Sequence, residues 1–410
     1  MILVIGGGPA GMMAALKASE TEKVTLIEKN EKLGKKLFIT GKGRCNLCND
    51  CDDPFFFETL NRNGSFMYSS YYSFTNFMLK DFFESRGTKL KVERGGRVFP
   101  ASDKSSDIIK TLDKALQENN VAVHLNTAVK SIQRKKDGFC LTTNRGEIFG
   151  DRVIVATGGL TYRLTGSTGD GYRWAEDLGM NVVRPIAGLV GLRLKENYLE
   201  TLSGLSLKNV QLTASAENGE FTDFGEMLFT HFGMSGPIVL SLSSKINRSK
   251  NVRLTLDLKP AIDANILENR ILREVRAHSN REIHTIMKQL LPNSLIFPVL
   301  DQAQVPKDLP SHQLTTAMRH RLVSTLKGFR LHYAGLFNEN TGIVTTGGVD
   351  VKDVDPSTME SRRAKGIYFC GEVLDVDGPT GGFNLQIAFS TGYLAGMCAA
   401  QEEKNEDHCD

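Results

Sequence analysis

The sequence predicts an α/β protein: a doubly wound, Rossmann-like domain is built from both ends of the chain and interrupted by a β-rich insert with a helical lobe. Three observations predict this fold. A glycine fingerprint follows a short apolar strand near the beginning, and a second strand with a glycine-rich turn lies near the end. Between them the hydrophobic pattern changes period twice.

The first observation is the stretch "MILVIGGGPAGMMAALKASETEKVTLIEKN". Residues 1–5 form an apolar run without alternation, as expected for a strand buried on both faces. Gly6, Gly8 and Gly11 follow at G-x-G-x-x-G spacing and lead into a helix, and a second apolar run ends in Glu28. A pyrophosphate would lie at the helix N-terminus, and the carboxylate would accept hydrogen bonds from a ribose. The pattern therefore predicts dinucleotide binding.

The two further glycine-rich strand ends favour FAD over NAD. In "DRVIVATGG" a buried strand ends at Thr157 and Gly158, and in "KGIYFCGEVLDVDGPTGGFNLQIAFSTG" another ends at Gly371 and Glu372. Asp375 is then placed to hydrogen-bond the ribityl or phosphate part of FAD, and the amides at 382–384 to face the flavin pyrimidine. A simple NAD domain has no need of such a distant second element, and no second G-x-G-x-x-G is present.

Seven stretches together resemble the BaiN/RdsA-type (YhiN-like) family of NAD(P)/FAD-dependent oxidoreductases. They occur in family order and extend over nearly the whole chain: "IGGGPAGMMAA", "EKNEKLGKKLFITGKGRCN", "VERGGRVFPASDKSSDI", "ATGGLTYRLTGSTGDGY", "GEMLFTHFGMSGPIVL", "TTGGVDV" and "FCGEVLDVDGPTGGFNLQIAFSTG". The resemblance implies a discontinuous FAD domain, an inserted β-barrel and a helical cap. The residues expected to bind FAD are Gly6, Gly8, Pro9, Ala10, Gly11, Glu28, Lys29, Lys36, Arg44, Asn46, Val129, Thr157, Gly158, Gly371, Glu372, Asp375, Gly382, Phe383 and Asn384.

The middle of the chain gives the expected domain boundaries. Residues 186–260 alternate apolar and polar side chains, as strands with one solvated face do, and residues 261–330 have a helical pattern. Residues 331–345 return to strand. The FAD domain would therefore consist of residues 1–185 and 346–410.

Two residues are candidates for catalysis, and no metal site is expected. Cys45, Cys48 and Cys51 are spaced C-x-x-C-x-x-C, but a cluster or zinc site needs four ligands, and neither a fourth cysteine nor a histidine follows before His124. Cys45 lies in the stretch expected to wrap the flavin, and His231 lies in "FTHFGMSGP", expected to reach the flavin from the insert. Either could donate a proton. The thiol could instead be packed inertly, and the histidine could be a turn residue bonded to backbone.

The resemblance implies reduction of a C=C bond conjugated to a carbonyl, with NAD(P)H as electron donor. A 3-oxo steroid or bile-acid substrate is favoured over ribosomal RNA, in which the reaction would reduce the C5=C6 bond of uridine. The resemblance also leaves open an amine oxidase of the aminoacetone type. A flavin that serves as a non-enzymatic redox sensor is a further hypothesis. The sequence defines no oligomeric state.

Bulk composition is that of an ordinary globular protein. The 410 residues carry a net charge of +3, and 40% of them are hydrophobic. No apolar run approaches the roughly 20 residues that span a bilayer. The beginning lacks a secretory pattern, and the odd count of seven cysteines favours reduced thiols. We therefore expect a cytoplasmic protein without membrane association.

Overall fold

The computed structural model describes residues 1–338 and 341–401, which form two units. Unit 1 contains residues 1–187 and 342–410, and unit 2 contains residues 188–341. The sequence places the insert at 186–345. Each unit has its own hydrophobic core. Among the described residues, no helix combines the length and apolar character needed to cross a bilayer.

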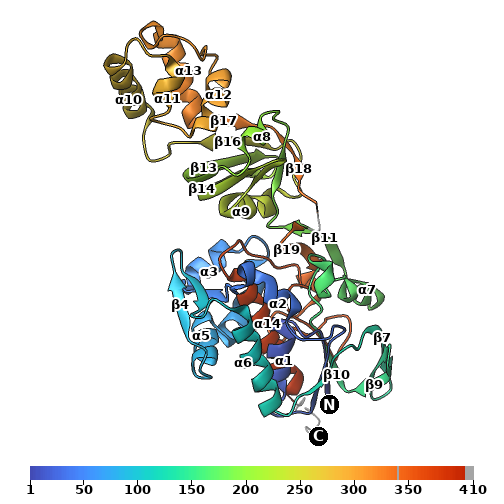
Figure 1. The fold of residues 1–410 in the computed structure, drawn as a ribbon. Helices are drawn as coiled ribbons and strands as arrows, with labels where there is room; N and C mark the ends of the chain where they lie inside the picture. Colours follow the sequence, from blue (N-terminus) through green and yellow to red (C-terminus); the bar gives the residue numbers. More distant parts are fainter. Residues whose placement is uncertain (339–340, 402–410) are drawn as a thin grey trace. The chain divides into compact units, whose positions relative to one another are not determined.

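Unit 1 is built on a five-stranded sheet whose neighbouring strands, among the described residues, all pair in parallel. Its strand order is β20-β10-β1-β2-β6, so the chain's first strand lies at the centre (Figure 1). The strands are β1 (Ile2–Ile5), β2 (Val24–Ile27), β6 (Ala122–His124), β10 (Arg152–Val155) and β20 (Ile367–Phe369). β1 and β2 are buried along their whole length, which explains why they read as continuous apolar runs.

Smaller elements surround this sheet. β3 (Cys48–Asn49), β5 (Arg97–Pro100) and β4 (Leu90–Glu93) form an antiparallel sheet, as do β7 (Val129–Lys135), β8 (Gly138–Thr143) and β9 (Gly146–Gly150). β11 (Val182–Gly188) pairs with β19 (Val344–Val349). The longer helices of this unit are α1 (Pro9–Ala18), α5 (Asn76–Glu84), α6 (Ser105–Glu118), α7 (Asp170–Asp177) and α14 (Phe383–Ala400), and the shorter ones are α2 (Lys35–Ile39), α3 (Asp53–Thr59) and α4 (Tyr68–Ser73).

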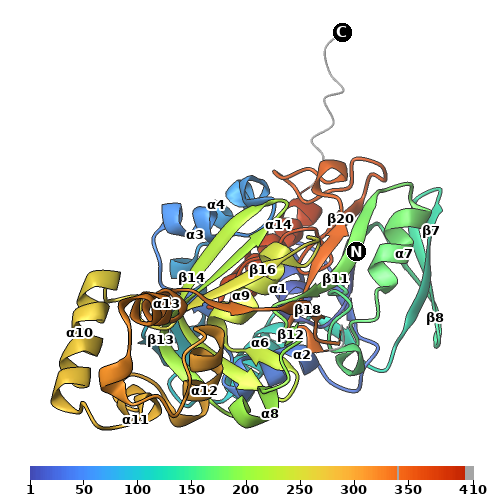
Figure 2. The same cartoon turned by 90° about the horizontal axis from the view of Figure 1, so that it is seen from above.

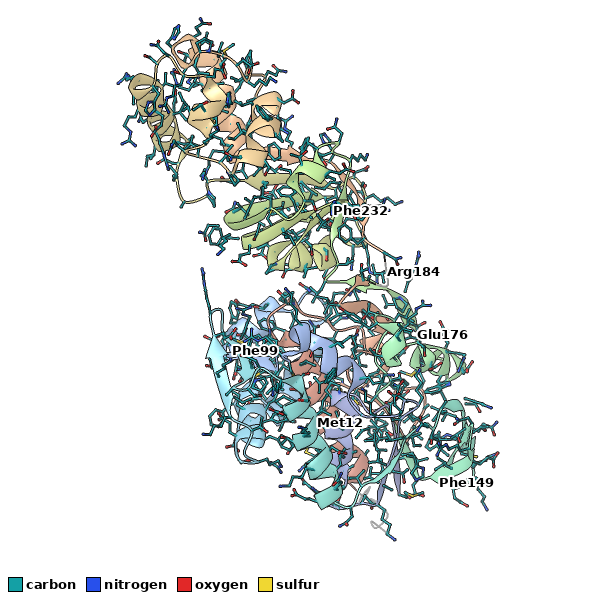
Figure 3. The ribbon with its side chains drawn as sticks, viewed as in Figure 1. Met12, Phe99, Phe149, Glu176, Arg184 and Phe232 are labelled. Atoms are coloured by element: carbon teal, nitrogen blue, oxygen red, sulfur yellow. The ribbon has the colours of Figure 1, made fainter. Side chains whose placement is uncertain are left out.

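The helices α1 and α14 pack with almost no space between their backbones. A Cβ atom added at Gly392 would lie 2.3 Å from the carbonyl oxygen of Ala10, and one added at Gly396 would lie 2.3 Å from that of Ala14. Both pairs are spaced i, i+4, so small residues on each helix face one another over a full turn. Met12, labelled in Figure 3, is also fully buried on α1.

Unit 2 contains a seven-stranded sheet with the order β17-β16-β13-β14-β15-β12-β18, in which neighbouring strands pair antiparallel. The strands are β12 (Leu192–Leu194), β13 (Ser206–Ala216), β14 (Gly219–Thr230), β15 (Gly233–Ser235), β16 (Arg253–Asp257), β17 (Phe329–Leu331) and β18 (Tyr333–Leu336). Only His332 separates the two edge strands in sequence, so the sheet must curve until its edges approach. Among the described residues, no ladder joins β17 to β18. The predicted α/β fold class is confirmed, but the inserted sheet is not a closed barrel.

Helices cover this sheet and form the predicted helical lobe. α9 (Pro237–Ile246) packs against β13 and β14 (Figure 2). The lobe contains α10 (Ala264–Ala277), α11 (Ile283–Met287), α12 (Asn293–Gln302) and α13 (Thr316–Lys327), and the short α8 (Leu199–Leu202) precedes β13. Asp263 and Thr315 cap α10 and α13, each accepting a backbone N–H three residues on.

The α1–α14 contact predicts that Gly→Ala substitutions in α14 lower the stability of the protein, the opposite of their usual effect in a helix. Gly→Ala inside a helix ordinarily stabilises by about 1 kcal/mol. Gly392→Ala should instead destabilise by about 1–3 kcal/mol, because the new methyl group meets a carbonyl that cannot move aside. The measurement is the free energy of unfolding from denaturant titration. Gly396→Ala should behave in the same way, and stabilisation by either variant would contradict the close approach.

Candidate FAD site

Four chain segments leave the parallel sheet at its carboxyl edge, where ligands bind in open α/β sheets. They follow β1, β2, β10 and β20, which lie next to one another in the strand order. The segments contain the fingerprint glycines, Glu28, Thr157 with Gly158, and Gly371 with Glu372. The structure thus brings together residues that are more than 300 positions apart in the chain.

The fingerprint turn is shaped by its glycines. Gly6 has φ +111°, and a Cβ there would lie 2.4 Å from the carbonyl oxygen of Ala156. A Cβ at Gly11 would lie 1.9 Å from the carbonyl oxygen of Gly6, so only a glycine lets α1 pass this close to the end of β1. At Gly8 a Cβ would meet nothing within 4 Å. Gly6 and Gly11 are therefore required by the protein itself, whereas Gly8 leaves an open approach to the helix N-terminus.

The N-terminus of α1 is suited to an anion. Gly8 is its N-cap and carries no side-chain cap, and Pro9 takes the first helical position, where its missing N–H costs nothing. Ala10 is buried behind the turn. A diphosphate would satisfy the free amides and interact favourably with the helix dipole.

Glu28 ties the end of β2 to this turn. Its carboxylate is buried, with Oε2 accepting the Gly7 N–H at 2.7 Å and Oε1 accepting the Asn30 N–H at 2.8 Å. The Asn30 side-chain amide also donates to Oε1, at 2.6 Å. An ionised carboxylate offers about four acceptor positions, so room is left for about one ribose hydroxyl.

The two neighbouring candidates have contacts of their own. Lys29 points to Asp170, with Nζ 2.8 Å from Oδ2. Val129 lies at the start of β7, two residues after Thr127, whose N–H bonds to the Glu28 carbonyl oxygen. Lys29 therefore holds the start of α7, and Val129 lies beside the segment that contains Glu28.

The end of β20 carries an ion pair. Lys36 from α2 contacts the Glu372 carboxylate at 2.7 Å, and the Thr345 N–H donates to the same carboxylate at 2.8 Å. Gly371 has φ +80°, and a Cβ there would lie 2.7 Å from the Ala10 Cβ. These contacts hold three separate segments around the expected ribityl position.

Asp375 has a different environment from the one expected of a free FAD ligand. Arg62 binds both of its carboxylate oxygens, at 2.9 and 3.0 Å, and Asn63 donates to its backbone carbonyl at 2.6 Å. The carboxylate raises the pKa of the Arg62 guanidinium. Sequence reasoning missed Arg62, because nothing near position 62 signals a partner 313 residues away.

The stretch at 40–46 forms a tight loop. Lys42 and Cys45 both have left-handed backbones, at φ +58° and +61°. Cys45 is fully buried, and burial raises the pKa of its thiol to about 12. The side-chain oxygen Oδ1 of Asn46 and the hydroxyl Oγ1 of Thr157 are buried without a hydrogen-bond partner. Buried polar atoms without partners are costly, so both fit a site completed by a polar ligand.

Arg44 does not present a free charge to a phosphate. Its guanidinium pairs with Glu93 and with Asp103 and lies 4.2 Å from the ring centre of Phe99, labelled in Figure 3. The two carboxylates raise the pKa of Arg44. This residue therefore anchors the loop on the β4–β5 hairpin.

The N-terminus of α14 lies against the cysteine-containing stretch that follows this loop. Gly382 has φ +102°, and a Cβ there would lie 2.3 Å from the backbone of Cys48. Phe383 is buried. The Asn384 side chain turns back to the loop before it, with Nδ2 donating to the Gly378 carbonyl at 2.7 Å. Asn384 can therefore offer its backbone amide, rather than its side chain, to a ligand.

His231 belongs to unit 2, at the exposed turn between β14 and β15. Its ring centre lies 6.3 Å from that of Phe232, which is 69% exposed (Figure 3). A catalytic role for this histidine stays a prediction.

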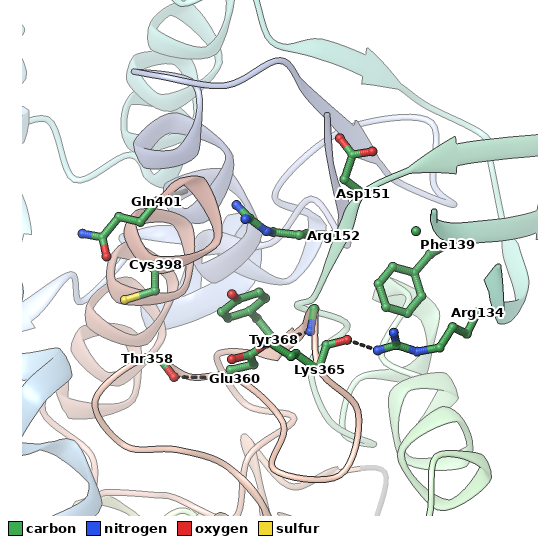
Figure 4. A pocket seen from close by; sticks show the side chains of 12 residues that line it. Arg134, Phe139, Asp151, Arg152, Thr358, Glu360, Lys365, Tyr368, Cys398 and Gln401 are labelled. Carbon is green, nitrogen blue, oxygen red and sulfur yellow. Dashed lines mark hydrogen bonds between the residues drawn. The ribbon is translucent and has the colours of Figure 1, made fainter. Parts of the chain in front are cut away.

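A pocket of about 420 Å³ lies at the opposite, amino edge of the sheet (Figure 4). Its charged groups are used internally: Arg134 donates to the Lys365 carbonyl, Arg152 to the Ala399 carbonyl at 2.6 Å, and Glu360 accepts the Gly366 N–H at 2.6 Å. These bonds join β10, β20 and the end of α14. The pocket therefore lies away from the residues expected to bind FAD, at the other edge of the sheet.

Together, the parallel sheet, the fingerprint and the second glycine turn define an FAD-binding oxidoreductase fold. A sequence model described as the HI0933-like protein Rossmann domain matches residues 1–398, so the chain belongs to the HI0933-like family. This agrees with the resemblance drawn from the motifs.

Two relatives are similar over nearly their whole length. The chain is 34% identical to a ribosomal RNA dihydrouridine synthase of Escherichia coli (strain K12), over 95% of this chain and 96% of the relative. It is 30% identical to a 3-dehydro-bile acid delta(4,6)-reductase of Clostridium scindens, over 97% and 98%. A 3-ketosteroid delta1-dehydrogenase from Sterolibacterium denitrificans shares the fold, with a TM-score of 0.51 and 14% identity over 97% of this chain and 99% of that one. The predicted enzyme class, a flavin-dependent oxidoreductase acting on CH–CH groups, is confirmed.

The geometry of Glu28 predicts its contribution to FAD binding. Glu28→Gln should weaken FAD about ten- to a hundredfold, because it removes a charge-assisted acceptor and disturbs the Gly7 turn. The dissociation constant is measured by fluorescence titration of the apoprotein. Glu31→Gln, three residues on and exposed, is the matched control and should leave the constant unchanged. Equal constants for the two variants would show that Glu28 does not contribute to FAD binding.

A second prediction concerns the clustered thiols. Burial raises the pKa of Cys51 to about 11 and raises that of Cys48 further, so both thiols are protonated at pH 7 and a metal ion would have to displace their protons. The contact of Cys48 with Gly382 gives this stretch a packing role at the N-terminus of α14. The Cys48→Ala, Cys51→Ala double variant should retain FAD and the same metal content as the parent, below about 0.1 equivalent by elemental analysis. Near one equivalent of iron or zinc in the parent, lost in the variant, would contradict the prediction.

Proposed function

We propose that this protein reduces a C=C bond conjugated to a carbonyl, using FAD that is reduced by NAD(P)H. The observation that carries the proposal is the convergence of the glycine-rich strand ends at one sheet edge, with buried polar atoms lacking partners beside them. Bound FAD would supply a hydride to the β-carbon of the substrate. A proton would then go to the α-carbon, so one hydride and one proton convert the C=C bond into a saturated CH–CH bond.

The chain's own residues would hold and polarise the cofactor. The free amides at the start of α1 would bind the diphosphate, and Glu28 would bind a ribose. The N-terminus of α14 would favour negative charge on the flavin pyrimidine during reduction. With no second dinucleotide fingerprint, NAD(P)H and substrate would use the same flavin face in turn.

Two substrate classes present the same reacting group. A 3-oxo steroid is supported by the bile-acid reductase relative, and uridine in RNA by the ribosomal RNA relative. The charge of the helical lobe favours RNA. Residues 261–330 contain ten Lys and Arg against six Asp and Glu, a net +4 within a chain of net +3. A bile-acid-type steroid carries at most one carboxylate, whereas RNA carries one negative charge per phosphodiester and gains more from such a surplus.

Anaerobic flavin spectroscopy tests the reaction. NADH or NADPH should bleach the flavin absorbance of the FAD-loaded protein. Unmodified large-subunit ribosomal RNA, or a 3-oxo-4,6-diene steroid, should then restore it and yield dihydrouridine or, with one of the two C=C bonds reduced per flavin, the 3-oxo monoene. Restoration by RNA alone selects the first class, and restoration by steroid alone selects the second. A reduced flavin that neither substrate reoxidises would favour a redox sensor.

The proton donor is tested by two variants. A buried thiol with a pKa near 12 is a weak acid at neutral pH, so His231 is the better candidate than Cys45. His231→Ala should slow flavin reoxidation by substrate roughly 10²–10⁴-fold and leave reduction by NAD(P)H intact. Phe232→Ala controls for disturbance of the loop and should have little effect. If His231→Ala reoxidises normally while Cys45→Ala is slow, the thiol is the donor.

A further inference from the structure

Between its N-cap Asp263 and its end at Ala277, α10 has no acidic side chain on its outward face; the exposed Glu282 follows beyond the helix. Ile266, Asn269, Arg273 and Arg276 follow one another at spacings of three, four and three residues, which places them along one side of the helix. All four are exposed, and Ile266 has 56% of its surface accessible although it is apolar. Arg281 follows just beyond the helix and is also exposed. We call these five residues the α10 stripe.

The acidic residues of α10 are directed elsewhere. Glu268 accepts a hydrogen bond from Arg319 on α13 at 2.7 Å and lies 3.3 Å from His320. Arg319 lowers the pKa of this carboxyl group. Glu274 is only partly exposed. α10 packs against α13 (Figure 1). The Glu268 carboxylate is therefore paired with Arg319 on the inner side of the helix.

The cations of the α10 stripe have no such partner. Within the described part of the chain, Arg273, Arg276 and Arg281 form no ion pair, whereas Arg319 and Lys327 of the same lobe each pair with a carboxylate. An alternative explanation for basic residues in the last turn of a helix is a favourable interaction with the helix dipole. That explanation suits Arg276, but Arg273 precedes the last turn and Arg281 lies outside the helix.

The chemistry of the stripe matches a nucleic acid better than an acidic protein. Guanidinium groups bind phosphate oxygens in a bidentate manner, and an Asn amide both donates to and accepts from base edges and ribose hydroxyls. An apolar Ile between them can cover a base or sugar face. A row of side chains on one helix also suits the regular spacing of a phosphate backbone.

We propose that the α10 stripe is a docking surface for the phosphodiester backbone of RNA. The inference rests on the proposed function in its RNA form and names the surface through which the helical lobe would hold that substrate. It requires no contact with FAD. Failure of docking and failure of the reaction can therefore be observed separately.

The experiment compares two charge-reversal variants of the FAD-loaded protein. Arg273→Glu with Arg276→Glu changes the stripe, and Lys110→Glu with Lys114→Glu makes the same charge change on the exposed face of helix α6 of unit 1. Binding to an unmodified large-subunit ribosomal RNA transcript is measured by fluorescence anisotropy over a range of salt concentrations. Arg273→Gln with Arg276→Gln, which only removes charge, covers the case in which the reversed pair disturbs the helix.

The stripe variant should bind RNA about tenfold more weakly or worse, and the slope of log affinity against log salt should fall by about two. The α6 variant should bind almost as tightly as the parent. Equal binding by parent and both stripe variants would overturn the inference, as would no binding by the parent. Equally tight, equally Arg-dependent binding of polyglutamate would overturn it too and assign the surface to acidic proteins.

The reaction is followed separately in the same proteins. Flavin reoxidation by a free small enone should be unchanged in the stripe variant, because the stripe requires no contact with the cofactor. If RNA does not reoxidise the flavin of the parent protein, the result contradicts the proposed reduction of RNA but not the proposed docking surface.

Discussion

The packing of α1 against both the parallel sheet and α14 is the constraint on which the rest of unit 1 depends. Gly11 allows α1 to contact the Gly6 carbonyl, and Gly392 and Gly396 allow α14 to contact carbonyls of α1. Because protein interiors are closely packed, a change in one of these contacts would shift the neighbouring helices. Since one helix N-terminus would bind the diphosphate and the other would face the flavin, the distance between their axes determines whether both ends of FAD can be held at once.

The charged groups around the site mostly neutralise one another. The ion pairs are Lys36 with Glu372, Arg62 with Asp375, and Arg44 with Glu93 and Asp103. A buried charge without a partner would destabilise the fold, so each of these charges is paired. The main role of these pairs is to connect segments that are distant along the chain. Anionic parts of the cofactor would then be held by backbone amides and helix ends rather than by free cations. Gly8 leaves the approach to such amides open, whereas Gly6 and Gly11 are required by close packing.

Local patterns in the sequence were sufficient to predict the fingerprint, the buried strands, the alternating strands of the insert and the helical lobe. Each of these depends on neighbours within a few residues, because strand and helix periods and glycine turns are local properties. The same patterns predict that Glu28 and the three glycine-rich strand ends lie near a common cofactor, and the structure brings them to one edge of the sheet. The motifs also identified the family.

Only the tertiary structure decided the partners of the polar side chains. Arg62 meets Asp375 across 313 residues, and Asn49 donates to the Gly381 carbonyl across 332. Arg44 turned to the β4–β5 hairpin, and the inserted sheet was left open at its edges. A periodic pattern in the sequence reports only on nearby residues, so it does not predict such pairs. They form because the packing of helices and strands brings together residues that are far apart along the chain.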